Sequence, residues 1–374
     1  MVRRDRTRHG PSLHYHAILS RRAIPMDTTF DLLTLALVPG LSPRAARELA
    51  SRGPLAEALD RPDAHGDLLG AAAREALRSG AARRLAGVEA RRARALGVRI
   101  VGRDEPDYPP WLRRVYAPPP VLWVRGALVA GEGERAVAVV GSRAATGLGL
   151  AFARTLARDL ASAGVTIVSG LARGIDTAAH RGALDARGRT VAVLGSGLDR
   201  LYPAENAPLG GAVAREGALV SEFPLDTGPW KGNFPRRNRV IAGWARAVVV
   251  VEAGRRSGAL STARAALDEG REVMAVPGHP AQPAADGTNG LLRDGAALVR
   301  GAPDVLGELG LASPAAEPRP ADEVLATMTR GVPASVDEIQ ARSGLALPAL
   351  LARLAELELG EAVVRLPGAL FMRG

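Results

Sequence analysis

Short apolar runs alternate with amphipathic stretches of helical length through the middle of the chain. The expected strands are Ala136–Val140, Thr166–Ser169, Thr190–Leu194, Leu219–Ser221, Ala247–Glu252, Val273–Val276 and Ala297–Val299. Segments between them, such as Gly149–Ala163, Asp176–Ala186 and Ser261–Glu269, have helical length and period. Runs that are apolar at nearly every position indicate strands buried on both faces. The pattern therefore predicts an α/β fold with a doubly wound, mainly parallel sheet over residues 96–311.

The chain before this sheet has a helical pattern from residue 26 to 95. Two helices are expected around the turn Val38–Leu41, the second capped by Ser42. This arrangement is typical of a SAM-like or helix-hairpin-helix domain, although a plain helical hairpin fits equally well. Short strands are expected at Val98–Val101 and Leu122–Gly126, on either side of a proline-rich passage.

The last part of the chain predicts a separate small domain. Residues 312–321 are rich in Pro and Ala and indicate a linker. Three helices (Asp322–Met328, Ser335–Ser343, Pro348–Leu357) and a hairpin (Ala362–Leu366, Leu370–Arg373) then predict a winged-helix-like domain over residues 322–374. Residues 321–374 contain five Arg and seven acidic residues. The helix that would enter a DNA groove has few cations, so we expect a structural or protein-contact role.

Residues 1–25 have neither a regular period nor the apolar core of a signal peptide. Three interpretations are open: a DNA-gripping arm, a targeting peptide, or an extension upstream of a start at Met26. We favour the extension and expect disorder there.

Composition narrows the chemistry. The chain has no Cys, which excludes disulfides, thiolate metal sites and a thiol nucleophile. No apolar run is long enough to span a membrane, so we expect a cytoplasmic protein. The net charge is +10, and Lys231 is the only lysine among 49 basic residues. A single retained lysine suggests a functional position, although chance could also leave one.

The first candidate site follows the first strand of the predicted parallel sheet. Gly141, Ser142 and Arg143 form a turn that runs into a helix, and such turns bind phosphate in doubly wound sheets. The glycine spacing differs from the dinucleotide fingerprint, and an Arg at this point suits an open phosphate such as a nucleic-acid backbone. A tight turn with a surface Arg remains the alternative.

A second turn contains Arg173 and leads to Asp176 and His180, which lie four residues apart on a helix. They could form an acid–base pair, but there is no third metal ligand and no nucleophile. We favour a capping role for Asp176 and a packing role for His180, and we expect neither a catalytic residue nor a metal.

The densest motif runs from Trp230 to Gly243. It contains Lys231, Asn233, Phe234, Arg236, Arg237, Asn238 and Arg239, and the stretch from Lys231 to Arg256 has seven cations and one acid. Cations beside an aromatic ring are what single-stranded nucleic acid needs, since the phosphates pair with the cations and a base stacks on the ring. The alternative is a solvated basic helix with Phe234 in the core.

Later turns are expected at the same edge of the sheet. One contains Ser257 and Gly258, and others contain His279 and the segment Gly287–Gly290. All follow strands, so they point to the carboxyl edge, where ligands bind in such sheets.

Together these motifs resemble the DprA/Smf family of bacterial DNA-processing proteins. The resemblance rests on YPPWL, GSRAAT, SGLARGIDTAAH, GSGLDRLYP, the stretch from SEFPLDTGPW to KGNFPRRNRVIAG, EAGRRSGALSTA, VPGH and GTNGLLRDGA. It implies a Rossmann-like domain that binds single-stranded DNA and dimerises, with a SAM-like domain before it and a winged-helix-like domain after it. It also implies that the protein loads the RecA recombinase onto DNA during natural transformation. In doing so it would relieve the block that single-strand binding protein places on RecA.

The resemblance places the DNA pocket at Ser142, Arg143, Lys231, Phe234, Arg236, Arg237 and Arg239. With neighbouring polar residues and turns, the expected DNA-contact set becomes Gly141, Ser142, Arg143, Arg173, Lys231, Asn233, Phe234, Arg236, Arg237, Asn238, Arg239, Ser257 and Gly258. No cofactor is expected.

Two other functions remain open. Nucleotide phosphoribohydrolases of the lysine-decarboxylase-like group have a similar sheet, but their PGGxGTxxE signature is not met, because the turn from Gly254 to Thr262 lacks the glutamate. A structural adaptor acting through its winged helix is the other alternative.

Overall fold

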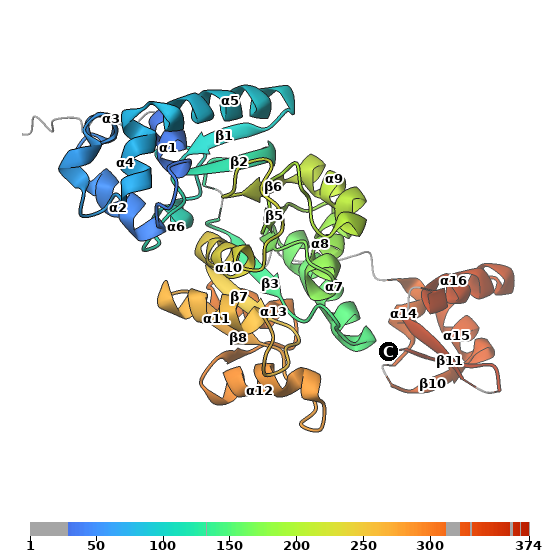
Figure 1. Cartoon of the computed structure of the whole chain (residues 1–374). Helices are drawn as coiled ribbons and strands as arrows, with labels where there is room; N and C mark the ends of the chain where they lie inside the picture. The colour runs from blue at the N-terminus through green and yellow to red at the C-terminus, as the bar shows by residue number, and fades with distance from the viewer. Residues whose placement is uncertain are drawn as a thin grey trace, which may run out of the picture. The chain divides into compact units, whose positions relative to one another are not determined.

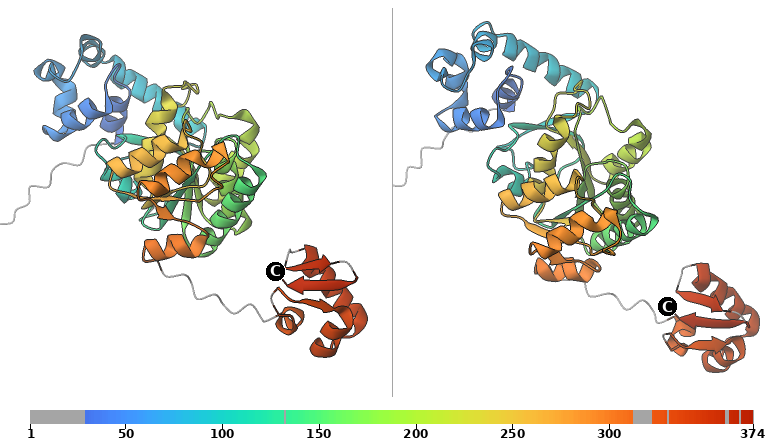
Figure 2. Two further views of the ribbon diagram at one scale, coloured as in Figure 1. Left: turned by 90° about the horizontal axis from the view of Figure 1, so that it is seen from below. Right: turned by 60° about the horizontal axis from the view of Figure 1, so that its bottom comes forward.

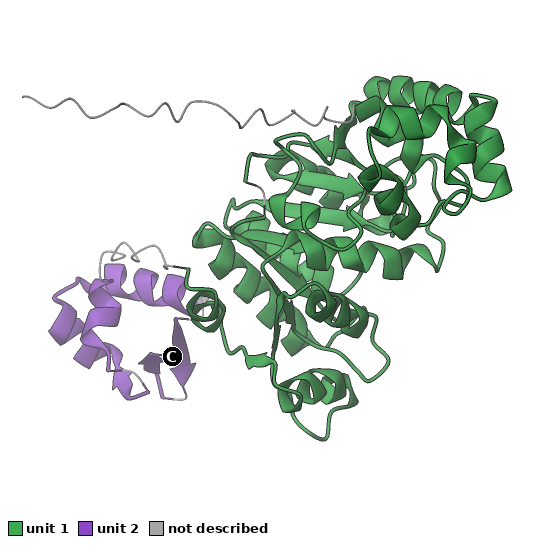
Figure 3. Ribbon diagram, turned by 90° about the vertical axis from the view of Figure 1, so that its left-hand side faces the viewer, with its two compact units in different colours: residues 1–311 green, residues 312–374 purple. Residues whose placement is uncertain are grey.

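The computed structural model describes residues 29–131, 133–311, 322–329, 331–359, 362–366 and 368–373. The chain divides into two compact units, residues 1–311 and 312–374 (Figure 3). The expected extension at residues 1–25 and the expected linker at 312–321 lie outside the described residues.

Nine strands of the described chain form one sheet in the order β1-β2-β6-β5-β4-β3-β7-β8-β9 (Figure 1). The strands are β1 (Arg99–Gly102), β2 (Val121–Gly126), β3 (Ala136–Val140), β4 (Thr166–Ser169), β5 (Thr190–Leu194), β6 (Ala218–Ser221), β7 (Ala247–Val250), β8 (Glu272–Ala275) and β9 (Ala297–Leu298). The seven strands from β6 to β9 in this order pair in parallel, whereas β1 and β2 extend the sheet antiparallel at β6. The predicted doubly wound, mainly parallel sheet is confirmed.

Helices cover both faces of the sheet because alternate strand residues point to opposite layers. The helices are α6 (Pro110–Arg113), α7 (Gly147–Ser162), α8 (Ile175–Asp185), α9 (Ala207–Glu216), α10 (Asn233–Trp244), α11 (Ala259–Asp268), α12 (Asp286–Arg293) and α13 (Ala302–Glu308). In β3, Ala138 packs with the layer of α10 and α11, and Val139 packs with the layer of α7, α8 and α13. All five residues of β3 and of β5 are buried, as their apolar runs predicted.

The order of the strands creates a crevice at one point of the carboxyl edge. From β3 the chain proceeds through β4 and β5 to β6, and α10 then returns it to β7 on the other side of β3. The loops after β3 and β7 therefore diverge, and this is where doubly wound sheets bind ligands.

The N-terminal helices share a core with the sheet. They are α1 (Thr29–Ala36), α2 (Pro43–Ser51), α3 (Leu55–Asp60), α4 (Ala71–Arg78) and α5 (Ala81–Ala95), and Figure 2 shows them at one end of the sheet. Leu32 and Leu49 belong to the same buried cluster as Trp123 of β2 and Leu219 of β6. The core is therefore continuous across residue 95, where the boundary between the helical domain and the sheet domain was expected.

The C-terminal unit has its own core. It contains α14 (Glu323–Thr327), β10 (Pro333–Ser335), α15 (Val336–Ser343), α16 (Leu347–Leu359), β11 (Val363–Leu366) and β12 (Leu370–Arg373). The strands form an antiparallel sheet in the order β10-β12-β11, so the expected hairpin is present and gains a third strand. On α16, Arg353 is paired with Asp322 and Glu356, which leaves little free positive charge on that helix.

The described helices include none with the length and apolar character needed to cross a bilayer.

A buried glutamate joins α5 to the loop after β6, and its removal should destabilise the protein. Glu89 is 7% exposed and accepts a hydrogen bond from the backbone N–H of Leu225 at 2.7 Å. Glu89→Ala would leave this buried donor unpaired, at a cost of about 1–3 kcal/mol of unfolding free energy. Urea denaturation of Glu89→Ala and of the control Glu75→Ala, an exposed residue of α4, measures the difference. Equal midpoints would contradict the assigned role of Glu89.

Candidate nucleic-acid interface

A cleft of about 820 Å³ lies at the crevice on the carboxyl edge of the sheet. Its walls come from the loops after β3, β4 and β7 and from α10. Eight of the predicted DNA-contact residues line it: Gly141, Ser142, Arg143, Phe234, Arg237, Asn238, Ser257 and Gly258. The fold therefore brings together motifs that lie more than 100 residues apart in the sequence.

Arg143 and Phe234 form the centre of this site. The guanidinium carbon of Arg143 lies 5.1 Å from the centre of the Phe234 ring, a cation–π arrangement. Tyr202 lies on another side of Phe234, with 6.0 Å between ring centres and 55° between ring planes. At Gly195 a Cβ would lie 2.7 Å from Phe234 Cδ1, so only glycine leaves room for the ring. Within the described chain, no carboxylate pairs with Arg143, and its charge remains available to a ligand.

Arg237 lines the cleft but is almost fully buried, and its expected contact with DNA stays a prediction. It is 4% exposed, and its Nη1 donates to the carbonyls of Gly170 at 2.7 Å and Val193 at 2.6 Å. A Cβ at Gly170 would lie 2.4 Å from the guanidinium. Burial lowers the pKa of Arg237 to about 10, while the charge of Asp176 opposes that shift. Arg237 thus binds the ends of β4 and β5 to α10.

Asp176 and His180 are both buried, but Asp176 does not cap α8 as expected, because it lies inside that helix and binds the loop before it instead. Asp176 is buried and accepts hydrogen bonds from the N–H groups of Gly170 at 3.1 Å and Ala172 at 3.3 Å. His180 is fully buried, with Nδ1 2.7 Å from the hydroxyl of Thr190. Burial, with a smaller contribution from the charge of Arg237, lowers the pKa of His180 to about 3, so the ring is neutral near pH 7.

Asn238 also lines the cleft and is largely buried. It is 9% exposed, and its Nδ2 donates to Ser261 Oγ at 2.7 Å and to the Gly258 carbonyl at 3.3 Å. Ser257 Oγ accepts from the N–H of Ala259 at 3.3 Å. These bonds hold the loop after β7 against α10, so Asn238 shapes the cleft wall from inside.

The two outer arginines of α10 share a buried carboxylate. Arg239 pairs closely with Glu222 and donates to the Ala117 carbonyl at 2.5 Å. Arg236 is 3.8 Å from Glu222, lies over the Phe223 ring at 5.0 Å and keeps half of its side chain exposed. Burial raises the pKa of Glu222, and the charge of Arg239 opposes that shift most strongly. Arg236 therefore remains accessible to a phosphate, whereas the side chain of Arg239 is 22% exposed and is held by Glu222 and the Ala117 carbonyl.

The remaining predicted residues are not part of the lining of this cleft. Lys231 is exposed, and no described carboxylate pairs with it. Asn233 Nδ2 donates to the Gly228 carbonyl at 3.2 Å and braces the loop before α10. Arg173 is paired with Glu205 at 2.5 Å, so its charge is largely compensated.

Sequence reasoning missed a buried carboxylate beneath the phosphate-type turn. Glu252 is 8% exposed and accepts from the N–H of Thr146 at 3.1 Å and from its hydroxyl at 2.7 Å. A Cβ at Gly149 would lie 2.4 Å from Glu252 Oε2. Thr146 caps α7, so a protein anion already occupies the position that a nucleotide phosphate takes in related sheets. Only the coincidence of a buried Glu and a glycine-rich turn could have suggested this.

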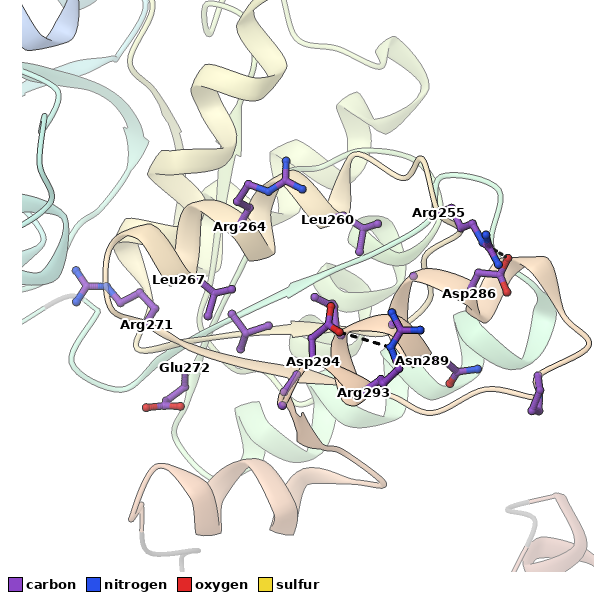
Figure 4. Close-up of a pocket in the computed structure, with 17 residues that line it drawn as sticks. Arg255, Leu260, Arg264, Leu267, Arg271, Glu272, Asp286, Asn289, Arg293 and Asp294 are labelled. Atoms are coloured by element: carbon purple, nitrogen blue, oxygen red, sulfur yellow. Dashed lines mark hydrogen bonds and ion pairs between the residues drawn. The ribbon is translucent and has the colours of Figure 1, made fainter.

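A second cleft, of about 840 Å³, lies between α11, α12 and the start of β8 (Figure 4). Its charges largely compensate one another: Arg255 pairs with Asp286 at 3.0 Å and Arg293 with Asp294 at 3.6 Å. The turn of His279 and the segment Gly287–Gly290 meet here, because Asn289 bonds to Gly278 through both its amide atoms. Arg264 is an exposed cation of this lining with no described carboxylate partner, but no aromatic side chain lines the cleft. It is therefore a poorer candidate for a single strand than the cleft at Arg143.

The described residues contain no group of three His, Asp or Glu side chains arranged to hold a metal ion.

Comparison with known proteins identifies the family. The model for "DNA recombination-mediator protein A" matches residues 99–310, and the model for "DprA winged helix domain" matches residues 311–369. Protein Smf of Escherichia coli is 41% identical over 285 residues, which cover 72% of this chain and 76% of that protein. The X-ray structure of DNA processing protein A from Streptococcus pneumoniae has a TM-score of 0.63 and 33% identity, and the match covers 75% of this chain and 98% of that one.

A structure of DNA processing protein A from Helicobacter pylori, described for its unique single-stranded DNA binding mode, matches with a TM-score of 0.50 and 31% identity. That match covers 54% of this chain and 92% of the other. The winged-helix prediction for the C-terminal unit is confirmed, and the SAM-like assignment of the N-terminal helices stays a prediction. The protein is a member of the DprA/Smf family of DNA recombination mediators.

Proposed function

We propose that this recombination mediator binds single-stranded DNA along the carboxyl edge of its sheet and delivers the strand to RecA. The observation that carries the proposal is the Arg143–Phe234 pair, an accessible cation stacked on an aromatic ring in a cleft wall. Lys231 and Arg236 add accessible positive charge, and no acidic residue lies between Asp226 and Glu252 in the sequence. The DNA-binding description of the Helicobacter pylori relative supports the same function.

A stacking ring favours single strands over duplex DNA. In a duplex both faces of each base are covered by neighbouring base pairs, so a ring in a cleft wall has no free base to meet. Phosphates of either form attract the cations, but only a single strand gains the stacking energy as well. Single-strand preference follows from the combination.

The partners are proposed from the family rather than from a surface. The proposed partners are RecA and a second copy of the chain, which fit a mediator that covers DNA and then transfers it. Such a mediator would also relieve the block that single-strand binding protein places on RecA. We propose a cytoplasmic site of action and no catalytic step.

The geometry disfavours the nucleotide-hydrolase alternative. Glu252 occupies the amino end of α7, where it would repel the phosphate of a nucleotide. Release of free base from a nucleoside monophosphate would nevertheless favour that alternative.

Removal of either accessible cation should weaken single-strand binding. For Lys231→Ala and Arg143→Ala we expect roughly tenfold lower affinity for an oligothymidine and a salt slope smaller by about 0.7 for each lost phosphate contact. Fluorescence anisotropy over a salt series, with single-stranded and duplex oligonucleotides, measures both quantities. Arg215→Ala is the matched control, because α9 ends at Glu216 and leads into the amino end of β6, on the opposite edge of the sheet. Unchanged affinity in both variants, or equal binding of duplex, would overturn the proposal.

Arg236 and Arg237 are adjacent but should respond differently to replacement by alanine. Arg237→Ala leaves two carbonyls and Asp176 without their buried cation, and it should cost about 3–5 kcal/mol of unfolding free energy. Arg236→Ala should weaken DNA binding severalfold and leave the denaturation midpoint nearly unchanged, since its side chain is half exposed. Urea denaturation and anisotropy on the same preparations separate the two effects. A stable Arg237→Ala protein would refute the structural role.

RecA delivery should require an intact DNA site. We expect the wild-type chain to accelerate RecA filament formation on DNA coated with single-strand binding protein, and Lys231→Ala to fail at the same concentration. The readout is RecA ATP hydrolysis dependent on coated DNA. Binding to bare DNA without acceleration would confine the function to strand protection.

A further inference from the structure

Trp230 is an exposed aromatic side chain in the loop that leads into α10, whose first turn contributes Phe234 to the candidate DNA site. Its relative exposure is 69%, whereas Trp123 and Trp244 are fully buried. It precedes Lys231 and lies four residues before Phe234. Trp230 is not one of the expected DNA-contact residues, although it belongs to the densest basic motif.

The loop before α10 holds Trp230 in a defined position. Its backbone N–H donates to the Gly228 carbonyl at 2.9 Å, and its own carbonyl accepts from the N–H of Asn233 at 2.9 Å. Asn233 Nδ2 closes the same loop on Gly228 at 3.2 Å. A Cβ at Gly228 would lie 3.3 Å from Trp230 Cε2, so one indole face rests on the glycine. The backbone that carries the indole is thus held in place before a ligand arrives, which lowers the entropy cost of binding.

The surroundings of Trp230 suit a nucleic acid better than a protein. Its exposed sequence neighbours are Pro229, Lys231 and Gly232, with the exposed Pro235 and Arg236 a turn further on. A protein partner would need further apolar surface around such an anchor, whereas a polyanion gains from the two cations. An indole is also a strong stacking surface, and every base has a π-face.

We propose that Trp230 is a second base-stacking platform, which holds a nucleotide next to the one on Phe234. The inference rests on the proposed single-strand binding and extends it, because two platforms on one short segment define the path of the strand past α10. Lys231 lies between the two rings in sequence and would neutralise phosphate on that path. Each of the two rings would contribute to DNA affinity by stacking on a base and not by contact with phosphate.

Substitutions at Trp230 test the platform. For Trp230→Leu we expect about fivefold to fiftyfold weaker binding of an oligothymidine, and for Trp230→Phe affinity close to the wild type, because Phe retains an aromatic face. An abasic oligonucleotide of equal length has the phosphates without the bases, so it should bind wild type and Trp230→Leu equally. Tyr116→Leu is the matched control, an exposed aromatic side chain that stacks under Arg47 instead.

Intrinsic fluorescence gives an independent readout. Trp123 and Trp244 are buried, and Trp111 is partly buried with the guanidinium of Arg271 over its ring, so Trp230 is the most exposed of the four tryptophans. Oligothymidine should therefore quench emission in the wild type and do so far less in Trp230→Phe, while the abasic strand should quench neither. Wild-type affinity in Trp230→Leu, or equal quenching by the abasic strand, would overturn the platform. If Lys231→Ala and Arg143→Ala still weaken binding in that case, the proposed function stands without it. If they do not, both proposals fail together.

Discussion

The arrangement of the candidate site depends on the hydrogen bonds that the buried guanidinium of Arg237 donates to two backbone carbonyls. Removing an arginine from water is costly, and here two carbonyls and the nearby charge of Asp176 offset the cost. Gly170 leaves the space that the guanidinium fills. Because Arg237 fastens α10 to the ends of β4 and β5, it fixes the first turn of the helix, and Phe234 with it.

The basic residues of one motif therefore divide between two tasks. Arg237 and Arg239 face inward and hold the framework, whereas Lys231 and Arg236 remain accessible to a ligand. Arg143 joins the accessible group from the other side of the cleft through its contact with Phe234. A strongly basic motif is thus not uniformly a binding surface, since a phosphate can reach only the charges that the fold leaves outside.

The same edge of the sheet also shows how a phosphate-type turn can serve a different ligand. Glu252 satisfies the amino end of α7, and the turn above it presents Arg143 outward. A helix terminus with a buried carboxylate has lost its attraction for a nucleotide phosphate. An exposed cation on a ring can still meet the backbone and bases of an extended strand, which agrees with membership of a family of recombination mediators.

The sequence by itself determined the doubly wound sheet, the C-terminal unit and which motifs lie at the carboxyl edge of the sheet. Continuous apolar runs and glycine-rich turns are local patterns, so a strand and the turn after it can be recognised without the rest of the fold. It also singled out Lys231 and Phe234. Only the tertiary structure decided that Arg237 is buried while Arg236 is accessible, since adjacent helical residues point in different directions and burial depends on β4 and β5. The joint core of the N-terminal helices and the sheet likewise depends on contacts between distant segments, which no local pattern encodes.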